Sequence, residues 1–88
     1  MSSKASPRVA GVESDEGPFT LRIRWIGGEE SLVDLAAIVG AFGAYAPLRS
    51  APGLFALVEV GEHGTDIVWP GGIDMSADTL WRIAQQGQ

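Results

Sequence analysis

The 88-residue sequence predicts a small α+β domain, built on an antiparallel, hairpin-based sheet of about five strands with a short middle helix and a C-terminal helix packed on one face. Three observations predict this fold. Residues 19–26 alternate between apolar and polar side chains, which is the two-residue period of a half-buried strand. Glycine-containing turns separate the apolar segments, as hairpins require. Residues 77–84 carry apolar side chains at helical spacing, which indicates a helix with one buried face.

The composition agrees with a single folded domain. Hydrophobic residues make up 45% of the chain, which is too apolar for a disordered protein. Residues 1–7 are small and polar, so we expect them to form a disordered tail, and residues 8–88 to form one domain. A domain of this length buries only roughly 60% of the surface of its unfolded chain, and we therefore expect its stability to be modest.

Several chemistries and locations are excluded by the composition alone. The chain has no cysteine, which rules out disulfides, thiolate nucleophiles and zinc-finger ligation. The N-terminal residues contain no apolar segment of the kind that a secretory signal needs. The longest uncharged stretch, residues 35–48, is shorter than the roughly 20 apolar residues of a membrane-spanning helix. We expect a soluble cytoplasmic protein without membrane association.

The first hairpin is the clearest predicted element. Residues 8–14 predict a short strand, and residues 13–18 have the composition of a turn. The next strand has an apolar and a polar face, formed by Phe19, Leu21, Ile23 and Trp25 on one side and by Thr20, Arg22 and Arg24 on the other. Glycines at 27 and 28 can take the positive φ angles of a tight turn, and residues 30–35 return as the partner strand. The arginines can then pair with Glu29 and Glu30 across the hairpin.

The middle of the chain predicts a short helix, a loop and a second hairpin. Asp34 can cap a helix within residues 35–42, and the prolines in residues 43–53 indicate a crossing loop. The second hairpin is expected from residues 54–60 and 65–69, around a turn that contains His63. Because both faces of this hairpin are largely apolar, we expect it to lie centrally in the sheet, covered on one side by a helix.

Residues 66–81, DIVWPGGIDMSADTLW, predict a compact corner that leads into the last helix. Pro70 and Gly71 fit the central positions of a type II turn. Ser76 is a good N-cap for a helix that begins at Ala77, and Met75 has the spacing of a hydrophobic staple with Leu80. The apolar face of this helix comprises Ala77, Leu80, Trp81 and Ala84, and Gly87 is expected to end it.

No catalytic, cofactor-binding or metal-binding residue is predicted, and we expect the protein not to be an enzyme. His63 is the only histidine, and no nearby residues complete a metal-ligand set. Asp66, Asp74 and Asp78 could converge as acid–base groups or Mg²⁺ ligands, although capping and turn roles already explain two of them. Ser76 has no histidine or lysine placed to activate it as a nucleophile.

Two features predict an interaction surface. The formal net charge of −5 repels phosphate backbones, so we expect no nucleic-acid binding by the isolated chain, and it suits a basic protein partner. Trp25 near a hairpin end and Trp81 on the last helix could form an exposed apolar patch. The GAFG segment at residues 40–43 has the form of one RNA-binding loop, but no basic residues adjoin it.

Several segments in order, RVAGVES, VDL, YAPLR, LFALVEV and IVWPGGIDMSADTLW, resemble the bacterial family called domain of unknown function 2442, over roughly residues 8–84. The most specific part is similar to the family's Trp-Pro-Asn-Gly-x-Asp pattern, with Gly71 where asparagine is usual. We treat this corner and two further tryptophans as the interaction or structural motif, which comprises Trp69, Pro70, Gly71, Gly72, Asp74, Ser76, Trp25 and Trp81.

The resemblance implies a small α+β domain, often encoded beside another small protein and suspected of being antitoxin-like. Our leading interpretation is therefore a protein-interaction module, the antitoxin-like or regulatory subunit of a two-protein operon, which binds a small basic partner. One alternative is a small-molecule- or metal-binding domain, possibly enzymatic, that uses the corner at residues 69–76. Another is a fragment of a transcription regulator that lacks its helix-turn-helix. Homodimer formation through the strand at residues 8–14 is compatible with each of these.

Overall fold

The predicted α+β class is confirmed by the computed structural model, which describes residues 7–51 and 53–86. Six antiparallel strands form two three-stranded sheets, with short helices between them and a longer helix at the end of the chain. The elements follow in the order β1 (Val9–Ser14), β2 (Thr20–Trp25), β3 (Glu30–Asp34), α1 (Ala36–Ala41), the 3₁₀ turn η1 (Gly43–Tyr45), α2 (Ala46–Ser50), the 3₁₀ turn η2 (Phe55–Leu57), β4 (Glu59–Val60), β5 (Asp66–Trp69), β6 (Ile73–Ser76) and α3 (Ala77–Gln86).

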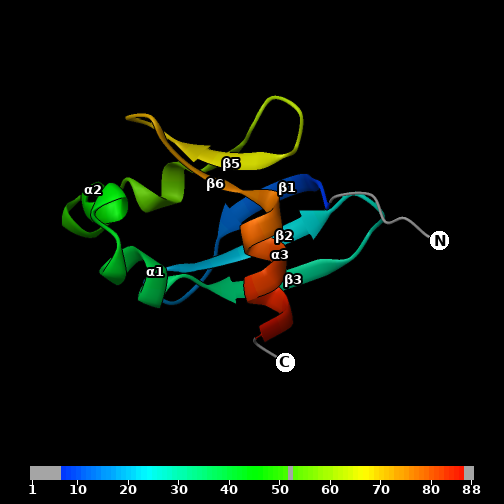
Figure 1. Ribbon diagram of the computed structural model, residues 1–88, viewed down its shortest axis with the longest axis horizontal. Coiled ribbons are helices and arrows are strands. Elements are labelled where there is room, and N and C mark those ends of the chain that lie inside the picture. Colours follow the sequence, from blue (N-terminus) through cyan, green and yellow to red (C-terminus); the bar gives the residue numbers. More distant parts are fainter. Residues whose placement is uncertain (1–6, 52, 87–88) are drawn as a thin grey trace.

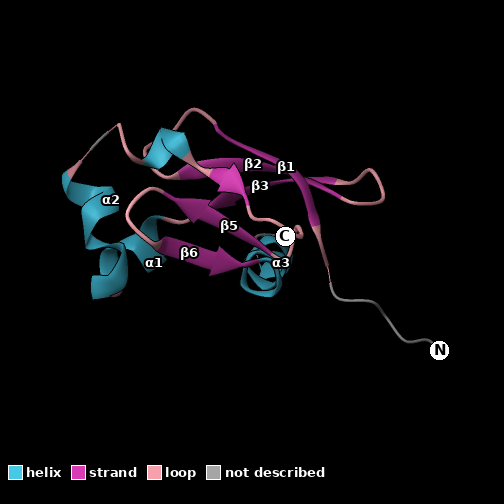
Figure 2. Ribbon diagram, turned by 90° about the horizontal axis from the view of Figure 1, so that it is seen from above, coloured by secondary structure: helices cyan, strands magenta, loops and turns pink. Residues whose placement is uncertain are grey.

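The elements form two layers around one core. The first sheet, in the order β1-β2-β3, is one layer. The second sheet, β4-β5-β6, and α3 together form the other layer, on the inner side of the first sheet (Figures 1 and 2). The short helices α1 and α2 lie together at one end. The outer face of the first sheet is open to solvent, because β5, β6 and α3 all lie on its other side (Figure 2).

The first hairpin has the predicted structure. Leu21, Ile23 and Trp25 are buried on the inner face of β2, at most 3% exposed, and their odd-numbered spacing is the predicted alternation. The turn between β2 and β3 uses Gly27 and Gly28 at φ angles of 113° and 103°. β1 and β3 pair with β2 on its two sides, in antiparallel register.

The second hairpin differs from the prediction. It forms its own sheet instead of lying centrally in one larger sheet, and β4 is only two residues long because residues 55–57 turn in 3₁₀ conformation. The sequence showed apolar side chains on both faces, but only Phe55 of this turn is buried, whereas Leu57 is 56% exposed. A sixth strand, β6, occupies residues that were expected only to lead into the last helix. Two packed small sheets bury apolar side chains as well as one larger sheet does, and the residue pattern does not distinguish the two.

The segment predicted as a crossing loop is largely helical. Residues 43–50 form η1 and α2, and Pro47 lies in the first turn of α2. A proline in that position loses no helical hydrogen bond, so it starts this helix instead of breaking it. Asp34 is not the predicted N-cap of α1, because that position is occupied by Leu35, which makes no side-chain cap hydrogen bond. The Asp34 carboxylate instead accepts a hydrogen bond from the N–H of Ala36, the first residue of the helix, at 2.9 Å. Gly87 and most of the predicted tail, residues 1–6, lie outside the described residues.

The core joins both sheets to α3. Its side chains come from β1–β3, β5, β6, the helical segments and one face of α3, and the fully buried large ones include Leu21, Ile23, Leu35, Leu48, Ile67 and Leu80. The two sheets are also tied through the backbone, since the Val9 N–H donates to the Gly64 carbonyl oxygen at 2.8 Å. α3 therefore cannot leave the second layer without exposing the centre of the core.

The start of α3 has the predicted cap. Ser76 Oγ accepts a hydrogen bond from the Thr79 backbone N–H at 3.1 Å, which is the N-cap to N3 geometry. Met75 and Leu80, the predicted staple pair, are both buried. The helix thus begins at Ala77, as the sequence predicts.

Replacing this cap with alanine should weaken the domain measurably. We expect Ser76→Ala to lower the free energy of unfolding by about 1 kcal/mol, because one N–H of the first helical turn loses its acceptor. Urea denaturation followed by circular dichroism measures the change. Ser76→Thr is the matched control, since threonine also caps a helix and adds no charge opposite Asp66, and it should keep most of the stability. Equal losses in the two variants would show that the cap is not what Ser76 contributes.

Candidate functional site

Trp69, at the centre of the predicted motif, is part of the core. It is 3% exposed, and its indole Nε1–H donates to the Phe55 carbonyl oxygen at 3.0 Å. Its ring stacks on Phe55 with centroids 5.8 Å apart and meets the Tyr45 ring edge-on at 6.5 Å. The indole thus joins β5 to η2 and η1, and no part of this arrangement presents a reactive group.

The turn after Trp69 has the positive φ angle that was predicted for Gly71, and Gly72 has one as well. Gly71 and Gly72 have φ angles of 94° and 81°, and Pro70 is exposed. The strand that follows is held from outside by Tyr45, whose hydroxyl donates to the Asp74 carbonyl oxygen at 3.1 Å. The pKa of Tyr45 is raised, first by burial and second by the negative charge of Asp74. The corner is therefore a well-bonded turn that fixes the edge of the second sheet.

The three aspartates around this corner do not form one site. Asp66 of β5 pairs with Ser76 of β6, and Asp74 lies two residues before Ser76. The two aspartates are therefore diagonal neighbours on one face of the sheet, and the Cα atoms of such neighbours are roughly 7–8 Å apart. Asp78 lies on α3, 3.8 Å from Arg82. Among residues 7–51 and 53–86, no three His, Asp or Glu side chains are grouped so as to hold a metal ion. The Ser76 hydroxyl is already bonded to Thr79, by its backbone N–H and by its side chain at 2.9 Å.

The expected exposed patch of tryptophans is not formed, because Trp25 is buried. Trp25 is only 3% exposed, and its Nε1–H donates to Ser31 Oγ at 3.0 Å. Trp81 is half-buried and packs edge-on against it, with ring centroids 5.1 Å apart. The pair joins α3 to the first sheet. Among the residues that the structure describes, the exposed large apolar side chains lie elsewhere and are Ile26, Leu32, Phe42 and Leu57.

His63 lies beside an open hollow of about 380 Å³ where the start of β1 meets the turn between β4 and β5. The charged side chains of this hollow are Arg8 and Glu62, one of each sign, and its apolar side chains include Ile26 and Val60. No buried side-chain polar atom among the described residues lacks a hydrogen-bond partner. The hollow therefore holds no pre-oriented group that would fix a ligand.

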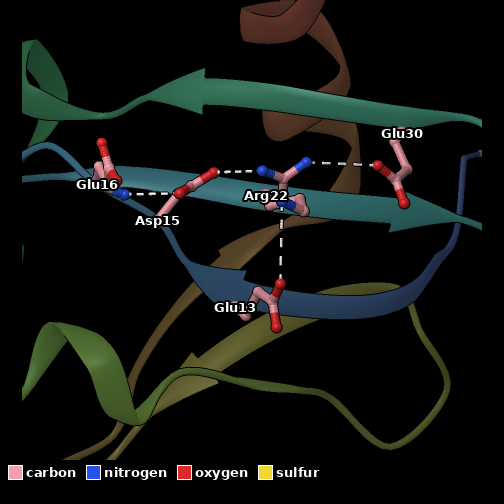
Figure 3. A network of polar contacts seen from close by, with 5 residues as sticks. All are labelled: Glu13, Asp15, Glu16, Arg22 and Glu30. Carbon is pink, nitrogen blue, oxygen red and sulfur yellow. Dashed lines mark hydrogen bonds and ion pairs between the residues drawn. The ribbon is translucent and has the colours of Figure 1, made fainter.

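The strongest electrostatic feature is on the outer face of the first sheet. Arg22, in the middle of β2, is surrounded by carboxylates from both sides (Figure 3). Its guanidinium group lies 2.8 Å from Asp15, 3.6 Å from Glu30 and 3.9 Å from Glu13. One cation thus faces three anions. Because the arginine side chain is 42% exposed, these pairs contribute at most about 1 kcal/mol each.

The surrounding residues increase this negative charge. Residues 9–34, which form the first sheet and its turns, carry six carboxylates and two guanidinium groups, a net charge of −4. The rest of the chain carries five carboxylates and four cations, a net charge of −1. Near the centre of this surface Leu32 is 59% exposed beside Arg22, its register partner. We call this surface the acidic face; its outward side chains are Glu13, Asp15, Arg22, Arg24, Glu30, Leu32 and Asp34, with Glu16 and Glu29 in the turns.

The sequence predicted only part of this surface. Pairing of Arg22 with Glu30 was expected and is present, but Glu13, Asp15 and Leu32 were not assigned to the same face. The available signal was the alternation in residues 30–34, which places Glu30, Leu32 and Asp34 on one side of β3. Combined with the alternation of β2, it would have placed Leu32 beside Arg22, but not Glu13 or Asp15.

Comparison with known proteins identifies the family. The family described as "Protein of unknown function (DUF2442)" matches residues 9–86, which is most of the chain. The chain belongs to the DUF2442 family. This confirms the resemblance seen in the sequence, and it places the acidic face and the corner at Trp69 inside the matched region of the DUF2442 domain.

One solved structure shares the fold of this DUF2442 domain. It is described as the crystal structure of "Putative DNA Binding Protein NE0471 from Nitrosomonas europaea ATCC 19718", and it matches with a TM-score of 0.81 at 26% sequence identity. The match covers 99% of this chain and 54% of that chain, so this chain spans about half of the other's length. The search among curated proteins found no relative. No helix in the described part of the chain is long and apolar enough to cross a membrane.

Proposed function

We propose that this DUF2442 domain is a non-enzymatic protein-interaction module that binds a small basic partner through its acidic face. The observation that carries the proposal is the distribution of charge. Four of the five net negative charges belong to residues 9–34, and their open outer face has an exposed leucine near its middle. Complementary charge steers association and selects partners, and a central apolar contact adds affinity.

The same charge distribution disfavours nucleic acid as the partner of the isolated chain. Binding to a phosphate backbone depends on clusters of lysine and arginine. Here the two arginines of the acidic face are outnumbered by carboxylates, three of which lie within 4 Å of Arg22. A basic protein surface gains from these carboxylates, whereas a nucleic acid is repelled by them.

The cellular role that fits this module is the antitoxin-like or regulatory subunit of a two-protein operon. This part of the proposal comes from the family resemblance, in which members are encoded beside another small protein. A subunit of this kind needs a recognition surface and no catalytic groups. The acidic face supplies such a surface, and the corner at Trp69 supports the fold that carries it.

Reversing two charges on the acidic face should weaken binding strongly. Each Glu→Lys change removes one negative charge and adds one positive charge. The double variant with Glu13→Lys and Glu30→Lys therefore changes the net charge of residues 9–34 from −4 to 0. We expect the affinity for the small basic protein encoded beside this chain to fall by about tenfold or more, which corresponds to about 1.4 kcal/mol. Isothermal titration calorimetry at low salt measures the change.

The matched control moves the same charge to a different surface. Glu59 and Glu62 are exposed near the second hairpin, outside residues 9–34, and Glu59→Lys with Glu62→Lys changes the net charge equally. The control should keep nearly the affinity of the unchanged chain. Equal weakening by both pairs would show that only net charge matters, and it would contradict the assignment of the acidic face. Failure of the neighbouring protein to bind at all would contradict the proposed function.

A second candidate follows from the solved structure that shares the fold. That protein carries a DNA-binding description, and this chain matches only 54% of its length. The domain would then be the partner-sensing half of a transcription regulator, and another part of such a protein would contact DNA. A gel shift at low salt distinguishes this role from direct DNA binding by the domain. The isolated chain should not slow the migration of DNA, and a shifted band would overturn both candidates.

A further inference from the structure

The strand edges of the two sheets differ in how they are covered. β1 and β4 contact each other, and the Val9 N–H bonds to the Gly64 carbonyl, so these edges meet. The expected pairing of β1 with a second copy would therefore have to displace contacts within the chain. At the edge of β6 the Tyr45 hydroxyl binds the Asp74 carbonyl. β3 is the remaining edge of the first sheet: α3 crosses its inner face and extends past it (Figure 1), but among the described residues no strand pairs with its outer side.

The hydrogen-bond pattern shows which backbone groups of β3 are available. Leu35 donates its N–H to the Phe19 carbonyl, and the Trp25 N–H donates to the Glu29 carbonyl. Hydrogen-bonded pairs alternate along an antiparallel ladder, so the odd-numbered residues of β3 bond to β2. The backbone groups of Glu30 and Leu32 therefore point away from β2. Within the described part of the chain no backbone hydrogen bond reaches them.

The side chains of the same residues give this edge a chemical pattern. Glu30, Leu32 and Asp34 all lie on the acidic face, and Leu32 is 59% exposed between the two carboxylates. Residues opposite one another in neighbouring strands interact through their side chains. A strand added beside β3 would thus meet an acidic, an apolar and an acidic side chain at alternate positions.

This pattern disfavours a second copy of the chain as the added strand. An antiparallel pairing of two β3 strands centred on Leu32 would place Glu30 of each copy opposite Asp34 of the other. Like charges directly opposite destabilise a strand pair. Acidic residues on an open edge are a known protection against self-pairing, and they still allow a strand of opposite charge to bind.

We propose that the free edge of β3 binds an extended segment of the basic partner as an added strand. The segment would carry an apolar side chain opposite Leu32 and a lysine or arginine opposite each of Glu30 and Asp34. Main-chain hydrogen bonds provide affinity in this mode, and the alternate side chains provide specificity. The inference rests on the proposed function, since it names the part of the acidic face that recognises the partner and the kind of segment recognised.

A symmetric peptide tests the inference. The probe is N-acetylated, C-amidated Thr-Lys-Thr-Leu-Thr-Lys-Thr, which presents the same pattern in either strand direction. Titrated into the ¹⁵N-labelled full chain, it should shift the amide signals of Glu30 and Leu32 most and slow hydrogen exchange at the Leu32 N–H at least about tenfold. A peptide with N-methylated leucine lacks the central donor, and a peptide with glutamates in place of lysines lacks the charge. Both should bind at least about tenfold more weakly.

The other outcomes separate failure of this inference from failure of the proposed function. Equal binding of the N-methylated peptide, with shifts spread around Arg22, would overturn the added strand and leave the acidic face as the binding surface. No shift at millimolar basic peptide would overturn the inference. If the neighbouring basic protein binds but the Leu32 N–H gains no protection from exchange in the complex, the added strand would be overturned and the proposed function would not. Concentration-dependent protection of Leu32 in the free chain would identify a second copy as the occupant and contradict the proposal.

Discussion

Replacing Trp69 with alanine is expected to lower the free energy of unfolding by about 3–5 kcal/mol, the range for removal of a large buried aromatic side chain. The indole is 3% exposed, stacks on Phe55 and contacts Tyr45 edge-on. The loss is comparable to much of the total stability of a small domain, which is about 5–15 kcal/mol. Urea denaturation followed by far-ultraviolet circular dichroism measures it, because this signal does not depend on the tryptophan removed.

A milder variant separates packing from hydrogen bonding at the same position. Trp69→Phe keeps an aromatic ring but leaves the Phe55 carbonyl without its indole donor. An unsatisfied buried group costs about 1–3 kcal/mol, so Trp69→Phe should be less destabilising than the alanine variant. If Trp69→Ala kept full stability and lost only partner binding, Trp69 would be a recognition residue, and our structural interpretation of the corner would be wrong.

The second large effect is expected at Gly64, where the two sheets meet. Gly64 has a φ angle of 74°, and a Cβ added there would lie 2.9 Å from the Val9 carbonyl oxygen. We expect Gly64→Ala to lower the free energy of unfolding by about 2–3 kcal/mol. About 1–2 kcal/mol comes from the left-handed backbone, and about 1 kcal/mol from the weakened hydrogen bond between Val9 and Gly64.

Gly71 provides the matched control for this variant. It also has a positive φ angle, 94°, but nothing lies within 4 Å of an added Cβ. Gly71→Ala should therefore show only the backbone cost, about 1–2 kcal/mol. Thermal and urea denaturation of both variants give the difference, which measures the contact between the sheets. A Gly71 variant as unstable as the Gly64 variant would mean that the close approach to Val9 contributes nothing.

How much of the fold the sequence predicts depends on how locally each element is determined. The first hairpin was predicted because alternation in β2 and the glycines at 27 and 28 specify it within one segment. The α3 cap was predicted for the same reason. Residues 54–58 were harder, because an apolar run fits a strand or a 3₁₀ turn, and packing against Trp69 selects the turn. The helical conformation of residues 43–50 differs from the expected loop because a proline breaks a helix only in its interior, and Pro47 lies in the first turn of α2.

The candidate site depends even more on long-range register. Glu13, Arg22 and Glu30 are separated by turns, and only the pairing of three strands brings them together. Net charge predicted that a basic partner would suit this chain, but it could not say where. The predicted tryptophan patch was wrong because a large aromatic side chain near a hairpin end can face either solvent or the core. Trp25 faces the core, where its indole N–H donates a hydrogen bond to Ser31 Oγ.

The most direct test of the acidic face is hydrogen exchange of this chain, free and in complex with the small basic protein encoded beside it. The proposed function predicts that protection gained on binding is concentrated in residues 9–34 and is largest along β3. It also predicts little change in residues 66–76, which include the buried Trp69. Protection confined to that corner, with none gained in the first sheet, would contradict the account and move the binding surface to the second sheet.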